Sequence, residues 1–297
     1  MCGIAGIIHF DGAPVPEGLV EGMCKTLRHR GPDDHGVVNL PMSASPSGGV
    51  AAALGNRRLS IVDVAGGHQP IGNEDGTIWA SFNGEIYNFV ELRERLIQEG
   101  HRFVTRSDTE VVVHAYEQWG DSFLCHLDGM FALAVWDSDN ERLLLGRDRF
   151  GKKPLLYFDD GERVAFASEF QALLRVPGLP RDIDLEALGT YLAYMAIPAP
   201  QTIYQQVKKV PPAHMLIRDR TGTSVSRYWT LSFQPKAAIA EEEVVERVRT
   251  LLGSAVRKRL MGEVPLGVFL SGGVDSSAVV AVMAELSDQP VKTFSIG

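Results

Sequence analysis

The sequence predicts an α+β protein in two parts. The first part is built of antiparallel sheet and helices, and the second is the beginning of an α/β domain with a parallel sheet. Three observations predict this. In the first part, strand-like runs are joined by short hairpin turns, and amphipathic helices interrupt them. The last part follows the order strand, glycine turn and helix.

Strand-like runs follow one another closely between residues 77 and 167. Residues 77–82 alternate in polarity and run into Asn83 and Gly84, a pair typical of hairpin turns because it tolerates positive φ. Consecutive hairpins indicate antiparallel sheet. Two further pairs of runs flank short turns rich in aspartate: residues 130–136 with 142–146, and residues 154–158 with 163–167.

Two helices interrupt these strands. Residues 88–98 have a helical pattern that stops before Gly100, a residue favoured at helix C-termini. Residues 108–119 form the second, and the spacing of Ser107 and Glu110 predicts a capping box. Residues 41–49, rich in proline, serine and glycine, predict a polar surface loop.

Prolines recur in residues 177–212 with little periodicity, and we place the connection between domains at about residues 200–235. We therefore expect a first domain at residues 1–210 and a second at 235–297. The second begins with a helix at 241–260, led by acidic and closed by basic residues. A strand at 266–270, a helix at 276–286 and a strand at 293–296 follow. Parallel sheets usually have more strands, so we expect this domain to be incomplete and the chain to be a fragment.

Composition excludes several classes of protein. Lys and Arg number 29 against 37 Asp and Glu, a net charge of −8, which argues against a nucleic-acid or anionic-membrane partner. No apolar run is long enough to span a membrane, and no signal segment follows Met1. The three cysteines cannot all pair, which is typical of a reduced, cytoplasmic setting.

Cys2 directly follows the initiator methionine. Removal of Met1 would leave a thiol and a free α-amine on one residue. The pKa of an α-amine is about 7.7, so it can act as the base for the thiol. An exposed thiol without function is the alternative that position alone leaves open.

Five motifs follow in order, and together they decide between these alternatives. This series resembles the glutaminase domain of class II glutamine amidotransferases, which are N-terminal nucleophile hydrolases. The resemblance covers roughly the first 190 residues and implies an αββα sandwich of two antiparallel sheets between helices. The motifs are CGIAGI at residues 2–7, RHRGPD at 28–33, RLSIVD at 58–63, NGEIYN at 83–88 and SDTE at 107–110.

Hydrolysis of a glutamine side-chain amide gives these residues roles. Cys2 would attack the amide carbon and form a thioester, while Asn83 and the Gly84 N–H stabilise the oxyanion. Arg58 would bind the α-carboxylate through its planar guanidinium, and Glu85 or Asp108 the α-ammonium. Taken singly, these residues have simpler interpretations. Asn83 and Gly84 suit a plain hairpin turn, Arg58 a surface charge and Asp108 an acid in the first turn of a helix. The predicted glutamine-binding residues are Arg58, Leu59, Ser60, Ile61, Val62, Asn83, Gly84, Glu85 and Asp108.

Other reactive residues of the first part are expected to be inert. His29 is not needed as a base because the α-amine supplies one. Cys24 and Cys125 lie in helical surroundings, and no cluster of cysteine and histidine has the spacing of a zinc site. We expect no cofactor for the glutaminase half.

The glycine turn SGGVDSS at residues 271–277 follows a strand and opens a helix. Glycines, serine hydroxyls and a helix N-terminus together suit a pyrophosphate, although a generic turn is the simpler reading. Asp275 would help to hold Mg²⁺, and no lysine of a Walker loop is present. The predicted ATP-binding residues are Leu270, Ser271, Gly272, Gly273, Asp275, Ser276 and Ile296, of which Leu270 and Ile296 rest on family analogy.

A class II glutaminase followed by this loop resembles the family of glutamine-hydrolysing asparagine synthetases. Residues 147–154 and 264–268 also match that family's pattern, whereas Asn56 and Arg57 depart from it modestly. The resemblance implies that ATP adenylates aspartate, releasing pyrophosphate, and that ammonia from glutamine then displaces AMP; a homodimer is also expected. Three alternatives stay open: an amidotransferase with another acceptor domain, a synthetase with another carboxylate acceptor, and a non-enzymatic interaction protein.

Overall fold

The computed structural model describes residues 1–40, 49–236 and 238–296. Residues 41–48, most of the predicted surface loop, lie outside the described residues. Two compact units divide the chain: Met1–Ser60 with Ala65–Thr230, and Ile61–Val64 with Leu231–Gly297. The first unit therefore continues beyond residue 210, because the last strands before Thr230 pair into its sheets.

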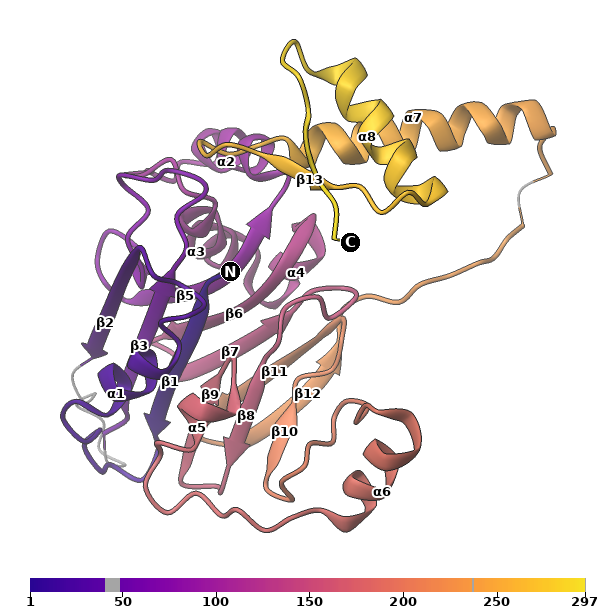
Figure 1. The fold of residues 1–297 in the computed structure, drawn as a ribbon. Helices are drawn as coiled ribbons and strands as arrows, with labels where there is room; N and C mark the ends of the chain where they lie inside the picture. The colour runs from indigo at the N-terminus through magenta and orange to yellow at the C-terminus, as the bar shows by residue number, and fades with distance from the viewer. Residues whose placement is uncertain (41–48, 237, 297) are drawn as a thin grey trace. The chain divides into compact units, whose positions relative to one another are not determined.

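The first unit contains two six-stranded sheets in which every neighbouring pair is antiparallel. The first has the order β10-β8-β9-β1-β3-β2 and the second the order β12-β11-β7-β6-β5-β4 (Figure 1). The first sheet comprises β1 (Gly3–His9), β2 (Asp34–Leu40), β3 (Ala51–Arg58), β8 (Leu156–Asp159), β9 (Arg163–Ala167) and β10 (Val207–Lys209). The second comprises β4 (Ile71–Gly72), β5 (Ile78–Ile86), β6 (Gly129–Asp137), β7 (Arg142–Arg147), β11 (His214–Asp219) and β12 (Gly222–Arg227).

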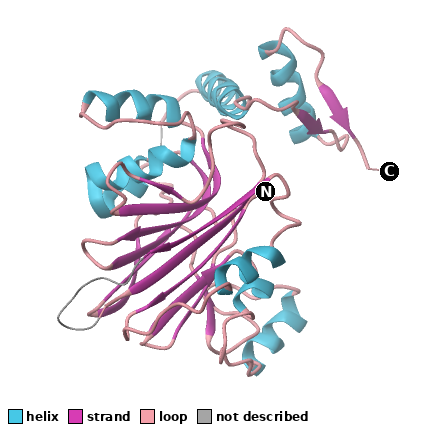
Figure 2. Ribbon diagram, turned by 90° about the vertical axis from the view of Figure 1, so that its left-hand side faces the viewer, coloured by secondary structure: helices cyan, strands magenta, loops and turns pink. Residues whose placement is uncertain are grey.

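Helices cover the outer faces of both sheets (Figure 2). Two helices, α1 (Leu19–Thr26) and α5 (Phe170–Leu173), pack on β1 and β9 of the first sheet. Three helices pack on β5 and β6 of the second sheet: α2 (Phe89–Gln98), α3 (Asp108–Trp119) and α4 (Phe123–His126). A short 3₁₀ turn, Gly120–Ser122, joins α3 to α4. The layers are helix, sheet, sheet and helix, so the predicted αββα class is confirmed. The sequence did not predict α6 (Leu185–Tyr194), which Asp184 caps amid the proline-rich stretch.

A central core fills the space between the sheets, and strand alternation builds it. Ile4 and Ile8 of β1 point into this core, whereas Ala5 and Ile7 point toward the helices. Apolar side chains from β3 and β6 complete it, including Leu54. Any polar residue at an inward-facing position of these strands therefore lies between the two sheets.

The hairpin turn predicted at Asn83 and Gly84 is wrong. Both residues lie inside β5, where they pair with Ala132 and Phe131 of β6. A Cβ on Gly84 would lie 2.3 Å from the Met130 carbonyl oxygen, so glycine is needed here for close strand packing and not for positive φ. The predicted hairpins β6–β7 and β8–β9 are confirmed.

The capping box predicted before α3 forms only in part. Ser107 is the N-cap, and its hydroxyl accepts a hydrogen bond from the Thr109 N–H. Glu110 instead accepts from the N–H groups of Val104 and Thr105, both at 2.7 Å. The loop before the helix folds back over the first turn, so the carboxylate satisfies that loop.

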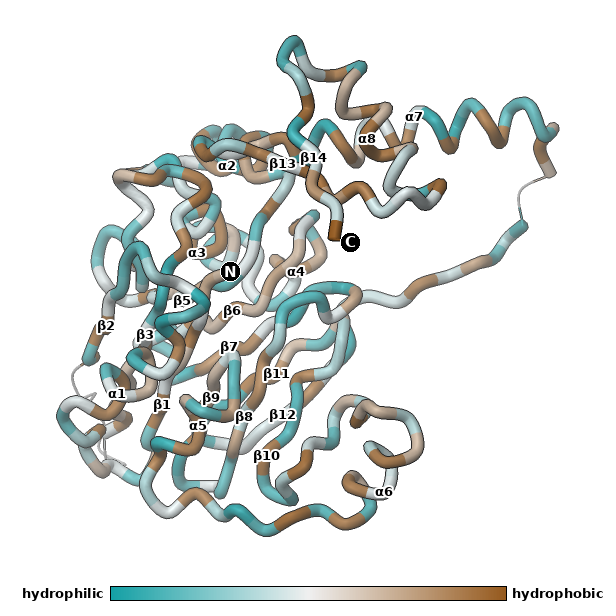
Figure 3. Tube along the Cα trace, viewed as in Figure 1, coloured by the Kyte–Doolittle hydropathy of each residue, from teal (hydrophilic) through white to brown (hydrophobic). Residues whose placement is uncertain are grey.

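The second unit contains α7 (Glu241–Arg259), β13 (Gly267–Phe269), α8 (Val274–Leu286) and β14 (Lys292–Phe294). β13 and β14 pair in parallel, as predicted, and α8 begins two residues before the predicted start at Ser276. In Figure 3, polar and apolar residues alternate along α7. Val248 and Leu251 on its apolar side are 58% and 68% exposed.

Candidate functional site

The strand ends bring the predicted glutaminase residues to one end of the space between the sheets. Cys2 precedes β1, and extending the alternation of Ile4 and Ile8 back by one step points its side chain between the sheets. The register of β1 and β3 pairs Gly3 with Arg57, so the next pair along joins Cys2 to Arg58. Arg58 is 5% exposed.

The Cys2 thiol lies against the segment that follows β3. The Leu59 N–H points at Sγ over 3.4 Å, and Sγ lies 3.7 Å from the Leu59 carbonyl oxygen. Burial raises the pKa of the thiol, and the nearby carboxylates of Glu85 and Asp108 raise it further. A thiol in this environment is protonated at neutral pH and needs a base before it can attack.

Motif residues around Cys2 hold the start of β1 in place. Arg30 donates from Nε to the Cys2 carbonyl oxygen at 2.8 Å, and its Nη1 pairs with Glu169 at 2.7 Å. The RHRGPD and RLSIVD motifs also join each other, because the Ser60 N–H donates to Asp33 at 2.9 Å. His29, which was not assigned a catalytic role, likewise contacts Glu169.

Asn83 is fully buried on the inner face of β5. Its neighbour Phe82 packs toward the helices, whereas Ser81 on the inner face donates to the Gly55 carbonyl oxygen of β3. Among the described residues, neither Nδ2 nor Oδ1 of Asn83 has a hydrogen-bond partner. A buried amide of this kind is costly unless a ligand completes its hydrogen bonds.

Two carboxylates enter the same end of the space between the sheets. Glu85 shares the inner face of β5 with Asn83, and Asp108 begins α3 and accepts a hydrogen bond from the Ile86 N–H at 3.0 Å. Burial raises the pKa of each carboxyl, and the negative charge of Asp108 raises the pKa of Glu85 further. The Arg58 charge opposes both shifts, so these three groups lie within electrostatic reach of one another.

Lys153 lies near these groups, although the sequence predicted no role for it. It is 6% exposed, and although burial lowers its pKa, the charges of Glu85 and Cys2 act to raise it. The backbone N–H groups of Lys152 and Lys153 both donate to the buried Asp148 carboxylate at 3.0 Å. Both lysines belong to the pattern at residues 147–154, whose approach to the site only the fold shows.

Gln69 is a second residue without an earlier assignment. Its Oε1 accepts from the Phe82 N–H at 2.8 Å and from Asn56 Nδ2 at 3.0 Å, and its Nε2 donates to Thr109 Oγ1 at 3.0 Å. One buried amide thus joins β3, β5 and the first turn of α3. Asn56, the modest departure from the family pattern, belongs to this network.

The other two cysteines lie in different surroundings. Burial raises the pKa of Cys24 to about 12, so this thiol is not ionised at neutral pH. Cys125 is exposed, and its Sγ lies 3.6 Å from the Tyr228 carbonyl oxygen.

The glycine turn of the second unit forms an open loop between β13 and α8. Gly272 has a φ of +79°, and no atom lies within 4 Å of the position of a Cβ. The hydroxyl oxygens of Ser271 and Ser276 are 3.0 Å apart, and Asp275 is exposed in the first turn of α8. This open backbone with hydroxyls at a helix N-terminus suits an anion.

Leu270 and Ile296 lie at the edge of the same two-stranded sheet. The Leu270 N–H donates to the Phe294 carbonyl oxygen at 2.8 Å, and the Ser295 hydroxyl donates to the Leu270 carbonyl oxygen at 2.7 Å. Ile296 is 92% exposed. Ile61 and Val62, two predicted glutamine contacts, group with this second unit, so their role stays a prediction.

Comparison with known proteins gives the family. The protein-family model of the glutamine amidotransferase domain matches residues 1–229, which is most of the chain. The chain belongs to this family. A model of asparagine synthase matches residues 247–297 of the same amidotransferase chain.

Curated relatives match the amidotransferase chain over both units. Asparagine synthetases [glutamine-hydrolyzing] 1 and 3 of Bacillus subtilis are 38% and 36% identical over 100% of this chain, which spans 46% and 48% of their lengths. Amidase chry2 of Gibberella zeae is 35% identical over 98% of the chain and 44% of its own length. The chain thus spans about half the length of these relatives, and the resemblance to glutamine-hydrolysing asparagine synthetases is confirmed.

Solved structures share the amidotransferase fold. The allosteric regulatory enzyme of purine biosynthesis matches with a TM-score of 0.55 and 20% identity, covering 98% of this chain and 64% of that one. The glutamine phosphoribosylpyrophosphate amidotransferase of B. subtilis matches with a TM-score of 0.53 and 20% identity, covering 99% and 65%. At this identity the likeness concerns the fold. Among the described helices, none is both long and apolar enough to cross a membrane.

Proposed function

We propose that the first unit hydrolyses the side-chain amide of glutamine to glutamate and ammonia. One observation carries the proposal. The half-buried thiol of Cys2 lies in register with Arg58, at the end of the space between the sheets that Glu85 and Asp108 also enter. Glutamine offers a carboxylate for the guanidinium and an ammonium for the carboxylates. The remaining reactive group of glutamine is the side-chain amide carbon, which the thiol attacks.

The chemistry needs the α-amine on Cys2 itself, and therefore removal of Met1. The amine takes the thiol proton as Sγ bonds to the amide carbon, and Asn83 Nδ2 with the Gly84 N–H stabilises the oxygen that becomes negative. The proton passes to the leaving nitrogen, ammonia departs, and water cleaves the thioester. The test is release of glutamate and ammonia in equal amounts from glutamine alone; no release would overturn the proposal.

For the full-length protein we propose glutamine-dependent asparagine synthesis, with aspartate and ATP as further substrates. The names of the B. subtilis relatives and the open glycine turn support it. Ser271, Gly272, Gly273 and Ser276 would hold pyrophosphate, Leu270 and Ile296 the adenine nucleotide, and Asp275 Mg²⁺, which would offset phosphate charge. The name of the amidase relative favours a second candidate, amidation of a different carboxylate. A cytoplasmic location and a homodimer stay predictions.

The nucleotide products test this second half. We expect the full-length protein to form AMP and pyrophosphate from ATP with aspartate, Mg²⁺ and glutamine, because the turn suits pyrophosphate and lacks a Walker lysine. Residues 1–297 alone should form neither, since a preformed site needs a surrounding shell. Chromatography of the nucleotides measures both. ADP from the full-length protein would contradict the assignment of the turn, and absence of both AMP and ADP with aspartate would favour another carboxylate acceptor.

Arg58→Lys is expected to raise the KM for glutamine about tenfold and to change kcat much less. Lysine keeps the charge but loses the paired hydrogen bonds to the α-carboxylate, a contact made equally in ground and transition states. Steady-state kinetics of glutamate release measures both constants. Arg163→Lys, whose parent arginine pairs with Asp160 in a hairpin, is the control and should leave KM unchanged. An unchanged KM in Arg58→Lys would remove Arg58 from the site.

Glutamine binding is expected to weaken as the pH falls below neutral, and to release protons near neutrality. The free carboxyls of Glu85 and Asp108 have raised pKa values, and an ammonium beside them lowers these values again. Protons therefore leave when glutamine binds, and acid opposes binding by up to about tenfold per pH unit for each proton. Calorimetry on the Cys2→Ala chain in buffers of different ionisation enthalpy measures the release. Glu85→Gln should reduce it; equal release from both chains would contradict the assignment.

A further inference from the structure

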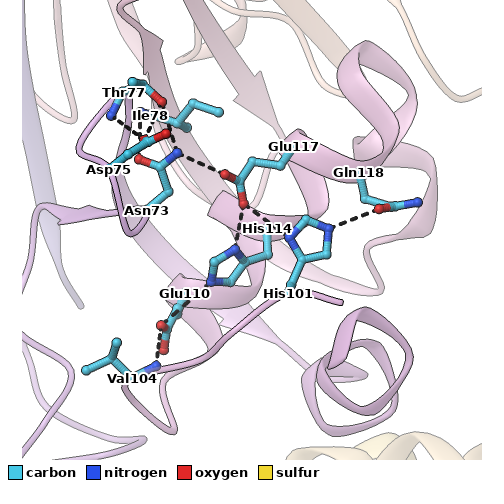
Figure 4. Close-up of polar contacts among 10 residues, drawn as sticks. All are labelled: Asn73, Asp75, Thr77, Ile78, His101, Val104, Glu110, His114, Glu117 and Gln118. Atoms are coloured by element: carbon cyan, nitrogen blue, oxygen red, sulfur yellow. Dashed lines mark hydrogen bonds and ion pairs between the residues drawn. The ribbon is translucent and has the colours of Figure 1, made fainter. Parts of the chain in front are cut away.

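Two histidines and a glutamate meet on the helix-covered side of the second sheet, apart from the residues assigned to glutamine (Figure 4). His101 lies in the loop after α2, and His114 and Glu117 lie one turn apart on α3. One ligand atom from each lies within 4.8 Å of the other two. Residue spacing does not reveal this cluster, because the loop brings His101 to this helix only in the folded chain.

The distances suit a metal ion held by both imidazoles and the carboxylate. Glu117 Oε2 lies 3.3 Å from His101 Nδ1 and 2.6 Å from His114 Nδ1. Ligands of a tetrahedral zinc ion, at about 2.0–2.1 Å from the metal, are about 3.3 Å from one another. The His101 separation already fits, and a small rotation of the Glu117 side chain, which is 20% exposed, opens the other.

The remaining polar atoms of the three side chains face partners that orient them. His101 Nε2 lies 3.0 Å from Gln118 Oε1, and Asn73 Nδ2 donates to Glu117 Oε1 at 2.9 Å. His114 Nε2 is buried, lies 3.7 Å from Glu110 Oε1 and has no hydrogen bond among the described residues. With a metal bound at both Nδ1 atoms, the ring protons would lie on the Nε2 atoms and face these acceptors.

The charge around His114 favours a cation. Two carboxylates flank this imidazole: Glu110 Oε1 lies 3.7 Å from Nε2, and Glu117 Oε2 lies 2.6 Å from Nδ1. Positive charge is therefore stabilised at a place where the histidine side chain is 1% exposed. A divalent ion bound by the imidazole would satisfy the Glu117 carboxylate in the same way.

We propose that His101, His114 and Glu117 bind Zn²⁺, with water as the fourth ligand. Imidazole and carboxylate ligands without thiolate suit this ion, and the side chains of His101 and Glu117, 16% and 20% exposed, leave it a route of entry. The ion joins the loop before α3 to the helix whose first residue is Asp108. It stabilises that helix and takes no part in the hydrolysis of glutamine.

The test is Zn²⁺ titration by calorimetry on the chain with Cys2→Ala and Cys125→Ala, which removes the two thiols that are not fully buried. We expect one bound ion, and visible absorption of a tetrahedral complex when Co²⁺ is used instead. His101→Gln in this background should weaken Zn²⁺ binding by more than about 100-fold, and Asn73→Ala, which removes the hydrogen bond that orients the Glu117 carboxylate, by about tenfold.

His126→Gln is the matched control, because His126 stacks on Trp119, the last residue of α3, and lies outside the cluster. It should bind Zn²⁺ as tightly as the parent chain. Circular dichroism checks that His101→Gln remains folded. Absence of a one-to-one complex in the parent chain, or equal affinity in the folded His101→Gln chain, would overturn the site.

Discussion

Replacement of Cys2 by alanine is expected to lower the rate of glutamine hydrolysis by at least about 10⁴-fold, to the background rate. The variant loses the thiol that forms the thioester, and no other cysteine can substitute for it. Cys24 is buried with a pKa of about 12, and Cys125 contacts Tyr228. The measurement is glutamate release. Activity retained by Cys2→Ala would contradict the proposed chemistry.

Two controls separate the thiol from the amine. Cys125→Ala should keep full activity, because this residue has no proposed role. A chain with a residue before Cys2 that is not removed keeps the thiol but displaces the α-amine. Because burial raises the pKa of this thiol, loss of the base should lower kcat about 10²–10⁴-fold.

Asn83→Ala is expected to lower kcat for glutamine hydrolysis about 10²–10³-fold with little change in KM. Its amide has no hydrogen-bond partner among the described residues, so its removal breaks no bond of the free protein. The donor acts when the amide oxygen becomes negative, which is why kcat carries the effect. Steady-state kinetics with thermal unfolding measures activity and stability together.

Asn56→Ala is the matched control for Asn83→Ala. Both asparagines are fully buried, but Asn56 Nδ2 donates to Gln69 and to the Phe82 carbonyl oxygen at 3.0 and 2.9 Å. Its loss takes the donor from the buried Phe82 carbonyl oxygen and one of the two donors from Gln69 Oε1, so stability should fall by about 1–3 kcal/mol. We expect Asn56→Ala to lose the more stability and Asn83→Ala the more kcat. The reverse order would remove Asn83 from the oxyanion site.

The sequence correctly predicted those elements that depend on residues close together in the chain. The hairpins of β6 with β7 and β8 with β9 follow from turn residues between alternating runs, and α3 follows from its period and its Ser107 cap. Asn83 and Gly84 misled for the same reason. Their turn propensity is local, whereas pairing with β6 is decided by a strand more than forty residues away.

The site was predicted only as far as ordered motifs reach. Four site residues each belong to such a motif: Cys2, Arg58, Glu85 and Asp108. The charges of their neighbours in this set contribute to the pKa shifts of Cys2, Glu85 and Asp108. Lys153 lies in a recognised pattern, but its approach to Glu85 depends on the path of a loop, which spacing does not encode.

The Asp148 carboxylate has a consequence for genetics. It accepts hydrogen bonds from four backbone N–H groups, those of Phe131, Phe150, Lys152 and Lys153, and so it fixes the loop that carries Lys153. Asparagine there would turn an amide NH₂ group, itself a donor, toward two of these N–H donors. A screen for loss-of-function alleles will therefore recover changes at Asp148 together with changes at Cys2, although Asp148 has no part in the proposed chemistry. Melting temperature, and not the severity of the phenotype, will tell the two kinds of allele apart.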